Sequence, residues 1–176
     1  MAKALATHRA GSALGVEPNE MFRRRTDRVI QETLRKTPLD VGADRIARTA
    51  HAALKLLGGI ANLAECPPIP LAWNSAISGV SAIEVYPAAT LIAHGIQSRG
   101  YKAPTQTSRR EGILTALKLE IDVEASCVDL EASADMLDAV VCVLAAKDFL
   151  QRRASPPPDL TLAQQEGWIW VSSSRA

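Results

Sequence analysis

Apolar residues recur at helical spacing along most of the chain. Between positions 21 and 34 they fall on one side of a helix that we expect to begin at Asn19, a favourable N-cap, and to end before Pro38. The next periodic segment predicts a helix over Ala43–Leu57, and the pair Gly58 and Gly59 is expected to end it.

Three more helices are predicted in the second half. Pro87 is suited to the first turn of a helix that ends near Gly95. Another helix is expected over Ser108–Leu119. The strongest pattern runs from Ser133, a good N-cap, to Gln151, and is rich in Ala, Leu and Val.

Strand signals are few. Gly79–Tyr86 is rich in β-forming residues and is bounded by glycine and proline, and the segment 166–171 (EGWIWV) predicts a short terminal strand. Trp168 and Trp170 alternate to one face of it, where we expect them to pack against a helix or, as the alternative, to be exposed to a partner. Two short strands make a poor sheet. The fold is therefore either largely helical or includes strands that precede Met1.

Composition predicts one ordinary globular domain. The chain has 176 residues, with 47% apolar and 22% charged residues and a net charge of +1, which excludes a strongly basic nucleic-acid binder at the level of the whole chain. Residues 1–18 are expected to be a flexible leader and residues 19–176 a single domain. No segment approaches the ~20 apolar residues of a membrane span. Three widely spaced cysteines fit a reducing, cytoplasmic location.

Three carboxylates are candidates for chemistry. Glu84 lies within the predicted strand, either exposed to solvent or placed at the mouth of a sheet to bind a divalent metal or act as a general base. Asp135 and Asp138 lie on one side of the strongest helix, roughly 60° apart. Asp135 is also explained by the helix dipole. Asp138 has small and apolar neighbours, so it is expected to be paired, protonated or metal-bound.

The segment 22–28 (FRRRTDR) packs four arginines around one aspartate. It is either a solvated helix face with ion pairs of little net worth or a patch that contacts phosphate groups. Lys102 and the pair Arg109 and Arg110 could extend such a patch. Tyr101 either stacks on a base or closes its loop.

Seven segments, in this order, together resemble an uncharacterised predicted-nuclease family with a ribonuclease-H-like fold (domain of unknown function 429). The resemblance covers residues 22–171, nearly the whole chain. The segments are FRRRTDRVI, PLDVGADRIARTA, AIEVYPAATL, GYK, an Arg-led helix, DMLDAVVCVLAA and EGWIWV.

The resemblance implies an α/β ribonuclease-H-like domain, helix-rich with few strands here, in which acidic residues hold Mg²⁺ or Mn²⁺ for phosphodiester hydrolysis. Glu84 matches the family's strand glutamate, and Asp135 and Asp138 match its D-x-x-D-A helix motif, so these three are the expected catalytic and metal-binding residues. The expected substrate-binding residues are Arg25 and Asp27 of the R-T-D triplet, Arg45 and Lys102.

The sequence also departs from the family pattern. Family members normally open with a strand that carries a G-x-D aspartate, followed by more strands, and nothing here corresponds to them. The sequence therefore predicts an N-terminally truncated member, either a metal-dependent nuclease with nucleic acid as partner and an incomplete metal site, or a non-catalytic binding module. In the second case we expect assembly into a homo-oligomer through an open sheet edge.

Overall fold

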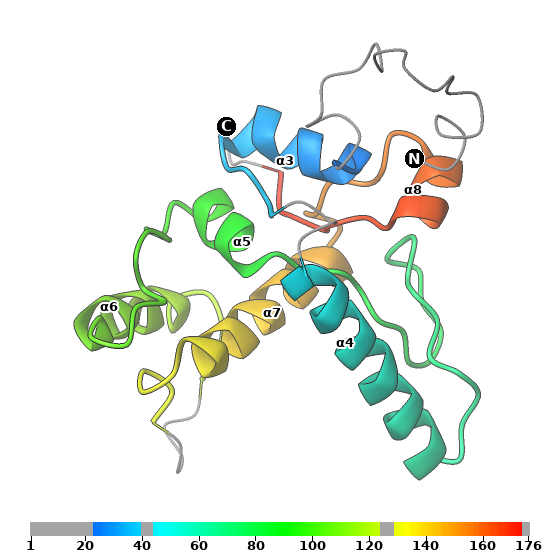
Figure 1. Cartoon of the computed structure of the whole chain (residues 1–176), viewed down its shortest axis with the longest axis horizontal. Helices are drawn as coiled ribbons and strands as arrows, with labels where there is room; N and C mark the ends of the chain where they lie inside the picture. The colour runs from blue at the N-terminus through cyan, green and yellow to red at the C-terminus, as the bar shows by residue number, and fades with distance from the viewer. Residues whose placement is uncertain (1–22, 40–43, 124–128, 174–176) are drawn as a thin grey trace, which may run out of the picture. The chain divides into compact units, whose positions relative to one another are not determined.

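The computed structural model describes residues 23–39, 44–123 and 129–173 and forms two compact units, Met1–Ile69 and Pro70–Ala176. The predicted leader and Asn19 lie outside the described residues. Figure 1 labels the helices of the two units. The first unit contains α3 (Arg25–Leu34) and α4 (Asp44–Leu63), and the second contains α5 (Pro87–Ala93), α6 (Thr107–Leu117), α7 (Ala134–Leu150) and α8 (Leu160–Glu166).

Helix α3 ends at Leu34, as a stop before Pro38 predicts, and Arg35 follows with a positive φ of 50°. At its start, both side-chain oxygens of Asp27 are bonded to Arg24. Oδ2 accepts hydrogen bonds from the backbone N–H and from Nε at 3.0 and 3.2 Å, and Oδ1 pairs with Nη2 at 3.2 Å. Asp27 is only 1% exposed. Its position is therefore explained by the capping of α3.

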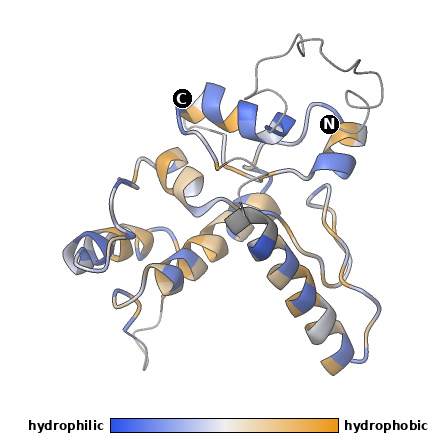
Figure 2. Ribbon diagram, in the orientation of Figure 1, coloured by the Kyte–Doolittle hydropathy of each residue, from blue (hydrophilic) through white to orange (hydrophobic). Residues whose placement is uncertain are grey.

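Helix α4 corrects the prediction that Gly58 and Gly59 end it, because it continues to Leu63. A glycine inside a helix costs only about 1 kcal/mol relative to alanine. The helix continues through Ile60, which is 42% exposed, and the buried Ala61, so the two glycines do not end it. Figure 2 shows hydrophilic and hydrophobic residues alternating around α4.

No helix among the residues described has both the length and the apolar content needed to cross a bilayer.

Helix α7 is the centre of the second unit, since both α5 and α6 pack against it. Ser133 caps α7 as predicted, with its Oγ accepting a hydrogen bond from the backbone N–H of Asp135 at 3.2 Å. Pro87 occupies the first turn of α5, also as predicted. Buried side chains from these helices and the loop after α5 form one core cluster: Leu91, Tyr101, Ile113, Leu114, Leu117, Leu137, Val141 and Leu144.

The two predicted strands are reduced to single bridges. Ala82 is bridged in parallel to Leu71, Glu84 in parallel to Ile169, and Ala154 antiparallel to Ser172. Within the described ranges these are the isolated pairings outside the helices, and the part of the prediction that the structure bears out is a helix-rich chain with few strands. Val80, placed in the predicted strand, is 68% exposed, so its β-forming character is not used for packing.

The C-terminal segment packs as the tryptophan pattern predicts. Trp170 lies edge-on to Phe149 at the end of α7, with ring centroids 4.7 Å apart, and Trp168 donates a hydrogen bond from Nε1 to the backbone oxygen of Ser155 at 3.0 Å. Both indoles are buried. Helix α8, just before them, was not predicted. Its signal is Asp159, whose side chain accepts a hydrogen bond from the N–H of Leu162 at 3.0 Å.

Candidate functional site

Asp138 is held by two residues from a different part of the chain. The hydroxyl of Tyr101 donates a hydrogen bond to Oδ1 at 2.5 Å, and the ammonium of Lys102 forms an ion pair with Oδ2 at 2.8 Å. The side chain of Asp138 is 17% exposed and that of Lys102 is 57% exposed. Asp138 is therefore paired, one of the three states expected for it, and its pair opens to solvent on the lysine side.

Arg110 fixes the loop that carries Tyr101 and Lys102. Its guanidinium, on α6, donates hydrogen bonds to five acceptors, and the residue is only 2% exposed. The acceptors are the backbone oxygens of Glu131 (2.5 Å), Tyr101 (2.9 Å), Ala103 (2.9 Å) and Pro104 (3.2 Å) and the hydroxyl of Thr107 (3.1 Å). Arg110 is thus a structural clamp, and its donors are not available to extend a phosphate-contact patch.

Burial and the charge of Asp138 keep three nearby side chains, Tyr86, Tyr101 and Cys142, protonated. Burial, and then the hydrogen bond to Asp138, raise the pKa of Tyr101 well above its ordinary value. Burial raises the pKa of Tyr86 despite the opposing effect of Lys102. Burial and the charge of Asp138 raise the pKa of the Cys142 thiol. Tyr101 therefore remains a hydrogen-bond donor at neutral pH, and Cys142 is not an activated thiolate.

Asp135 is exposed and lies in the first turn of α7, three residues before Asp138. It lines a hollow of about 400 Å³ together with Lys102 and Arg110. Lys102 thus lines the same hollow as Asp135, and its ammonium pairs with Asp138. These three predicted residues, Asp135, Asp138 and Lys102, are the ones that the structure brings together.

Glu84 lies in the same unit, and its backbone oxygen accepts a hydrogen bond from the N–H of Trp170 at 3.0 Å. Its side chain is partly buried. No group of three His, Cys, Asp or Glu side chains that could hold a metal ion occurs among the described residues. The predicted set Glu84, Asp135 and Asp138 is therefore not assembled as a metal-binding group in this arrangement.

The other predicted substrate-binding residues lie in the first unit. Arg25 is exposed at the start of α3, and Asp27 is buried there as part of the helix cap. Arg45 lies in the first turn of α4, and its side chain is outside the described residues. Lys102 belongs to the second unit.

Sequence reasoning missed a second polar cluster. His94 Nε2 lies 2.7 Å from Oδ2 of Asp148, and Arg153 Nη2 lies 2.9 Å from Oδ1. The second contact is an ion pair without hydrogen-bond alignment. His94 and Asp148 are 54 residues apart, so no local spacing could indicate this pair. The one signal was an aspartate among the apolar residues near the end of α7.

Comparison with known proteins identifies the family and leaves its activity open. No curated protein and no solved structure matches the chain. A family model described as "Protein of unknown function (DUF429)" matches residues 10–161, well over half of the sequence. The resemblance of the ordered motifs to domain of unknown function 429 is thereby confirmed, and the chain belongs to the DUF429 family of proteins of unknown function.

Proposed function

We propose that this chain acts in metal-dependent phosphodiester hydrolysis as a nuclease with a ribonuclease-H-like fold, and that Asp138 and Lys102 are central to its site. The observation that supports the proposal is the 2.8 Å ion pair between them. The sequence predicts these two residues separately, Asp138 as a metal-binding carboxylate and Lys102 as a contact to substrate. Because the two side chains are in contact, they can act together in one site.

The chemistry of the pair suits phosphate. The side chain of Lys102 is more than half exposed, so its ammonium can contact a phosphate oxygen without moving far from Asp138. The Tyr101 hydroxyl fixes the orientation of the Asp138 carboxylate. Mg²⁺ and Mn²⁺ prefer carboxylate oxygen ligands, and such an ion, when bound, lowers the pKa of water and stabilises charge on phosphate.

The described side chains do not fit a complete two-metal site. Such sites need several carboxylates to hold ions ~3.5–4 Å apart, whereas no three-ligand group occurs in the part of the chain that the structure describes. Both oxygens of Asp138 also have partners within the chain. Asp138 would supply one ligand, with Asp135 as the nearest predicted second, and any cation there would compete with the ammonium of Lys102.

This competition gives a sharp test by calorimetric titration with Mn²⁺. We expect the parent to bind Mn²⁺ and Asp138→Asn to lose the binding. Lys102→Met should bind about two- to fivefold more tightly, because it removes an ion pair of exposed type. Asp122→Asn is the matched control, since Asp122 is exposed and lies outside the Asp138 cluster. Its binding should equal that of the parent.

Cleavage of labelled single-stranded RNA and DNA in Mn²⁺ then tests the activity. Asp138→Asn should abolish cleavage while its circular dichroism spectrum stays that of the parent. Unchanged Mn²⁺ affinity in Asp138→Asn would refute the assignment of Asp138.

A non-catalytic binding module is the second candidate. It is favoured by the fact that Asp138 is already neutralised by Lys102 and bonded to Tyr101. If the folded parent binds no Mn²⁺, this candidate replaces the first.

A further inference from the structure

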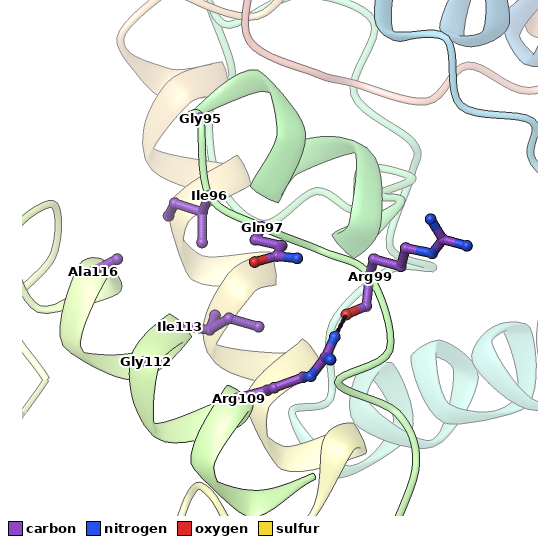
Figure 3. A pocket seen from close by; sticks show the side chains of 8 residues that line it. All are labelled: Gly95, Ile96, Gln97, Arg99, Arg109, Gly112, Ile113 and Ala116. Carbon is purple, nitrogen blue, oxygen red and sulfur yellow. Dashed lines mark hydrogen bonds between the residues drawn. The ribbon is translucent and has the colours of Figure 1, made fainter.

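A pocket of about 380 Å³ lies between the segment that follows α5 and one side of α6. Figure 3 shows Gln97 and Arg109 extending toward it from the two sides, with Ile96 and Ile113 beside them. Its volume is within the range of small-ligand sites, ~300–1,000 Å³. Neither Asp138 nor Lys102 is among its lining residues, so it is distinct from the candidate site described above.

The guanidinium of Arg109 is held in place by backbone. Its Nη1 donates a hydrogen bond to the carbonyl oxygen of Arg99 at 2.8 Å. Gly100 adopts a φ of +80°, and a Cβ at that position would stand 2.9 Å from the same nitrogen. Glycine at this position leaves room for the guanidinium beside the backbone. The arginine is ordered before any ligand binds, which lowers the entropy lost on binding.

Most of the hydrogen-bonding capacity of Arg109 is unused. A guanidinium has five N–H donors, and the bond to Arg99 takes one of them. The pocket lining contains two arginines, one glutamine amide and no carboxylate. An adjoining hollow of about 490 Å³ shares Gln97, Arg99 and Arg109 with it. The guanidinium of Arg99 points away in Figure 3, so Arg109 supplies the positive charge inside the pocket.

The neighbouring Arg110 differs from Arg109 in burial and in hydrogen bonding. Arg110 is 2% exposed and donates to five acceptors within the chain, whereas Arg109 is exposed. Consecutive residues point about 100° apart around a helix. One arginine of the pair therefore serves the fold, and the other is presented at the pocket.

We propose that Arg109, assisted by the amide of Gln97, binds a phosphate group in this pocket. A guanidinium pairs with two oxygens of a phosphate at once, and an amide N–H can reach a third. The phosphate can belong to a free nucleotide or to a nucleic-acid backbone. That the phosphate belongs to a nucleic-acid backbone rests on the proposed function. The phosphate contact itself needs neither Asp138 nor a metal ion.

The test is fluorescence anisotropy of a labelled ten-nucleotide single strand, in EDTA, with adenosine monophosphate and inorganic phosphate as competitors. We expect Arg109→Gln to weaken binding about tenfold and to lower the slope of log K against log salt by about 0.7. Lys118→Gln, at the residue that follows the last turn of the same helix, removes the same charge from an exposed residue outside the pocket lining, and it should bind like the parent.

The competitors distinguish the two sources of phosphate. A strand that neither adenosine monophosphate nor inorganic phosphate displaces supports a backbone contact, and displacement by the mononucleotide at similar concentration supports a nucleotide site. Equal affinities of Arg109→Gln and Lys118→Gln would overturn the proposal, as would a parent that binds none of the three probes. EDTA removes divalent cations, so failure here is separate from failure of Mn²⁺ binding at Asp138.

An NMR titration of the parent with inorganic phosphate does not depend on any variant folding. The backbone amides of Gly95 and Gly112, which line the pocket, should shift on binding. Shifts confined to other residues would also overturn the proposal.

Discussion

Replacement of Arg110 by methionine should destabilise the second unit and should also loosen the loop that carries Tyr101 and Lys102. Arg110 is buried, and its guanidinium ties α6 to the loop that carries Tyr101 and Lys102 and to the backbone of Glu131. Methionine keeps the apolar stem of the side chain but lacks the guanidinium and donates no hydrogen bond. The change therefore isolates the guanidinium from the packing of the stem.

The magnitude follows from the acceptors that lose their donor. Four of the five are backbone carbonyl oxygens, at 2.5–3.2 Å from the guanidinium nitrogens. A hydrogen bond from a charged donor contributes about 1.5–3 kcal/mol, but such contributions are not additive, and water can reach partly exposed acceptors. We therefore expect a loss of at least about 3 kcal/mol, a large share of the 5–15 kcal/mol that is typical of a whole domain.

The assay is urea unfolding followed by circular dichroism, with Arg109→Met as the matched control. Arg109 is exposed and makes one hydrogen bond to the chain, so its replacement should cost less than about 1 kcal/mol. A loss below 1 kcal/mol for Arg110→Met, or equal losses for the two variants, would refute the assignment of Arg110 as the clamp of this loop.

Two further predictions concern Tyr101 and the start of α3. The pKa of Tyr101 is raised above its ordinary value of about 10 by burial and by its bond to Asp138, so its contribution to stability is complete below about pH 10 and is lost as the pH rises above it. Tyr101→Phe should be less stable than the parent by about 1–2 kcal/mol at pH 7 and lose less stability above pH 10. Parallel curves of unfolding free energy against pH would contradict this. Asp27→Ala should destabilise the first unit by about 1–2 kcal/mol, because it removes the acceptor of the Arg24 N–H and its ion pair, and thermal unfolding unchanged from the parent would exclude this role.

The elements that could be predicted from the sequence are those with a local start signal. Pro87 begins α5 and Ser133 caps α7, and both helices start where those residues indicate. The end of α4 could not be predicted, because the small local cost of Gly58 and Gly59 does not by itself decide where a helix ends. The strand predicted over Gly79–Tyr86 is reduced to single bridges. β-forming residues pair only where a partner segment lies alongside.

The site was predictable as a set of residue types but not as a geometry. The apolar surroundings of Asp138 predicted that it is paired, protonated or metal-bound, and the ion pair with Lys102 decides for the first in this arrangement. Its partners lie more than 30 residues away in the sequence, and no spacing rule covers such a distance. The same limit explains why two adjacent arginines, alike in sequence, could not be told apart. Their roles depend on which direction each faces from α6.

Two aspartates of α7 show which features separate a structural carboxylate from an available one. Asp148 is 1% exposed, and its partner His94 is also buried, at 6%. Displacing His94 would leave the buried Asp148 with only its ion pair to Arg153, which has no hydrogen-bond alignment, and that loss is costly. Asp138 has 17% of its side chain exposed, and its partner Lys102 is 57% exposed, so that ammonium can turn to solvent at a cost of about 1 kcal/mol or less. Of these two carboxylates, Asp138 is therefore the one whose ion pair can open to solvent.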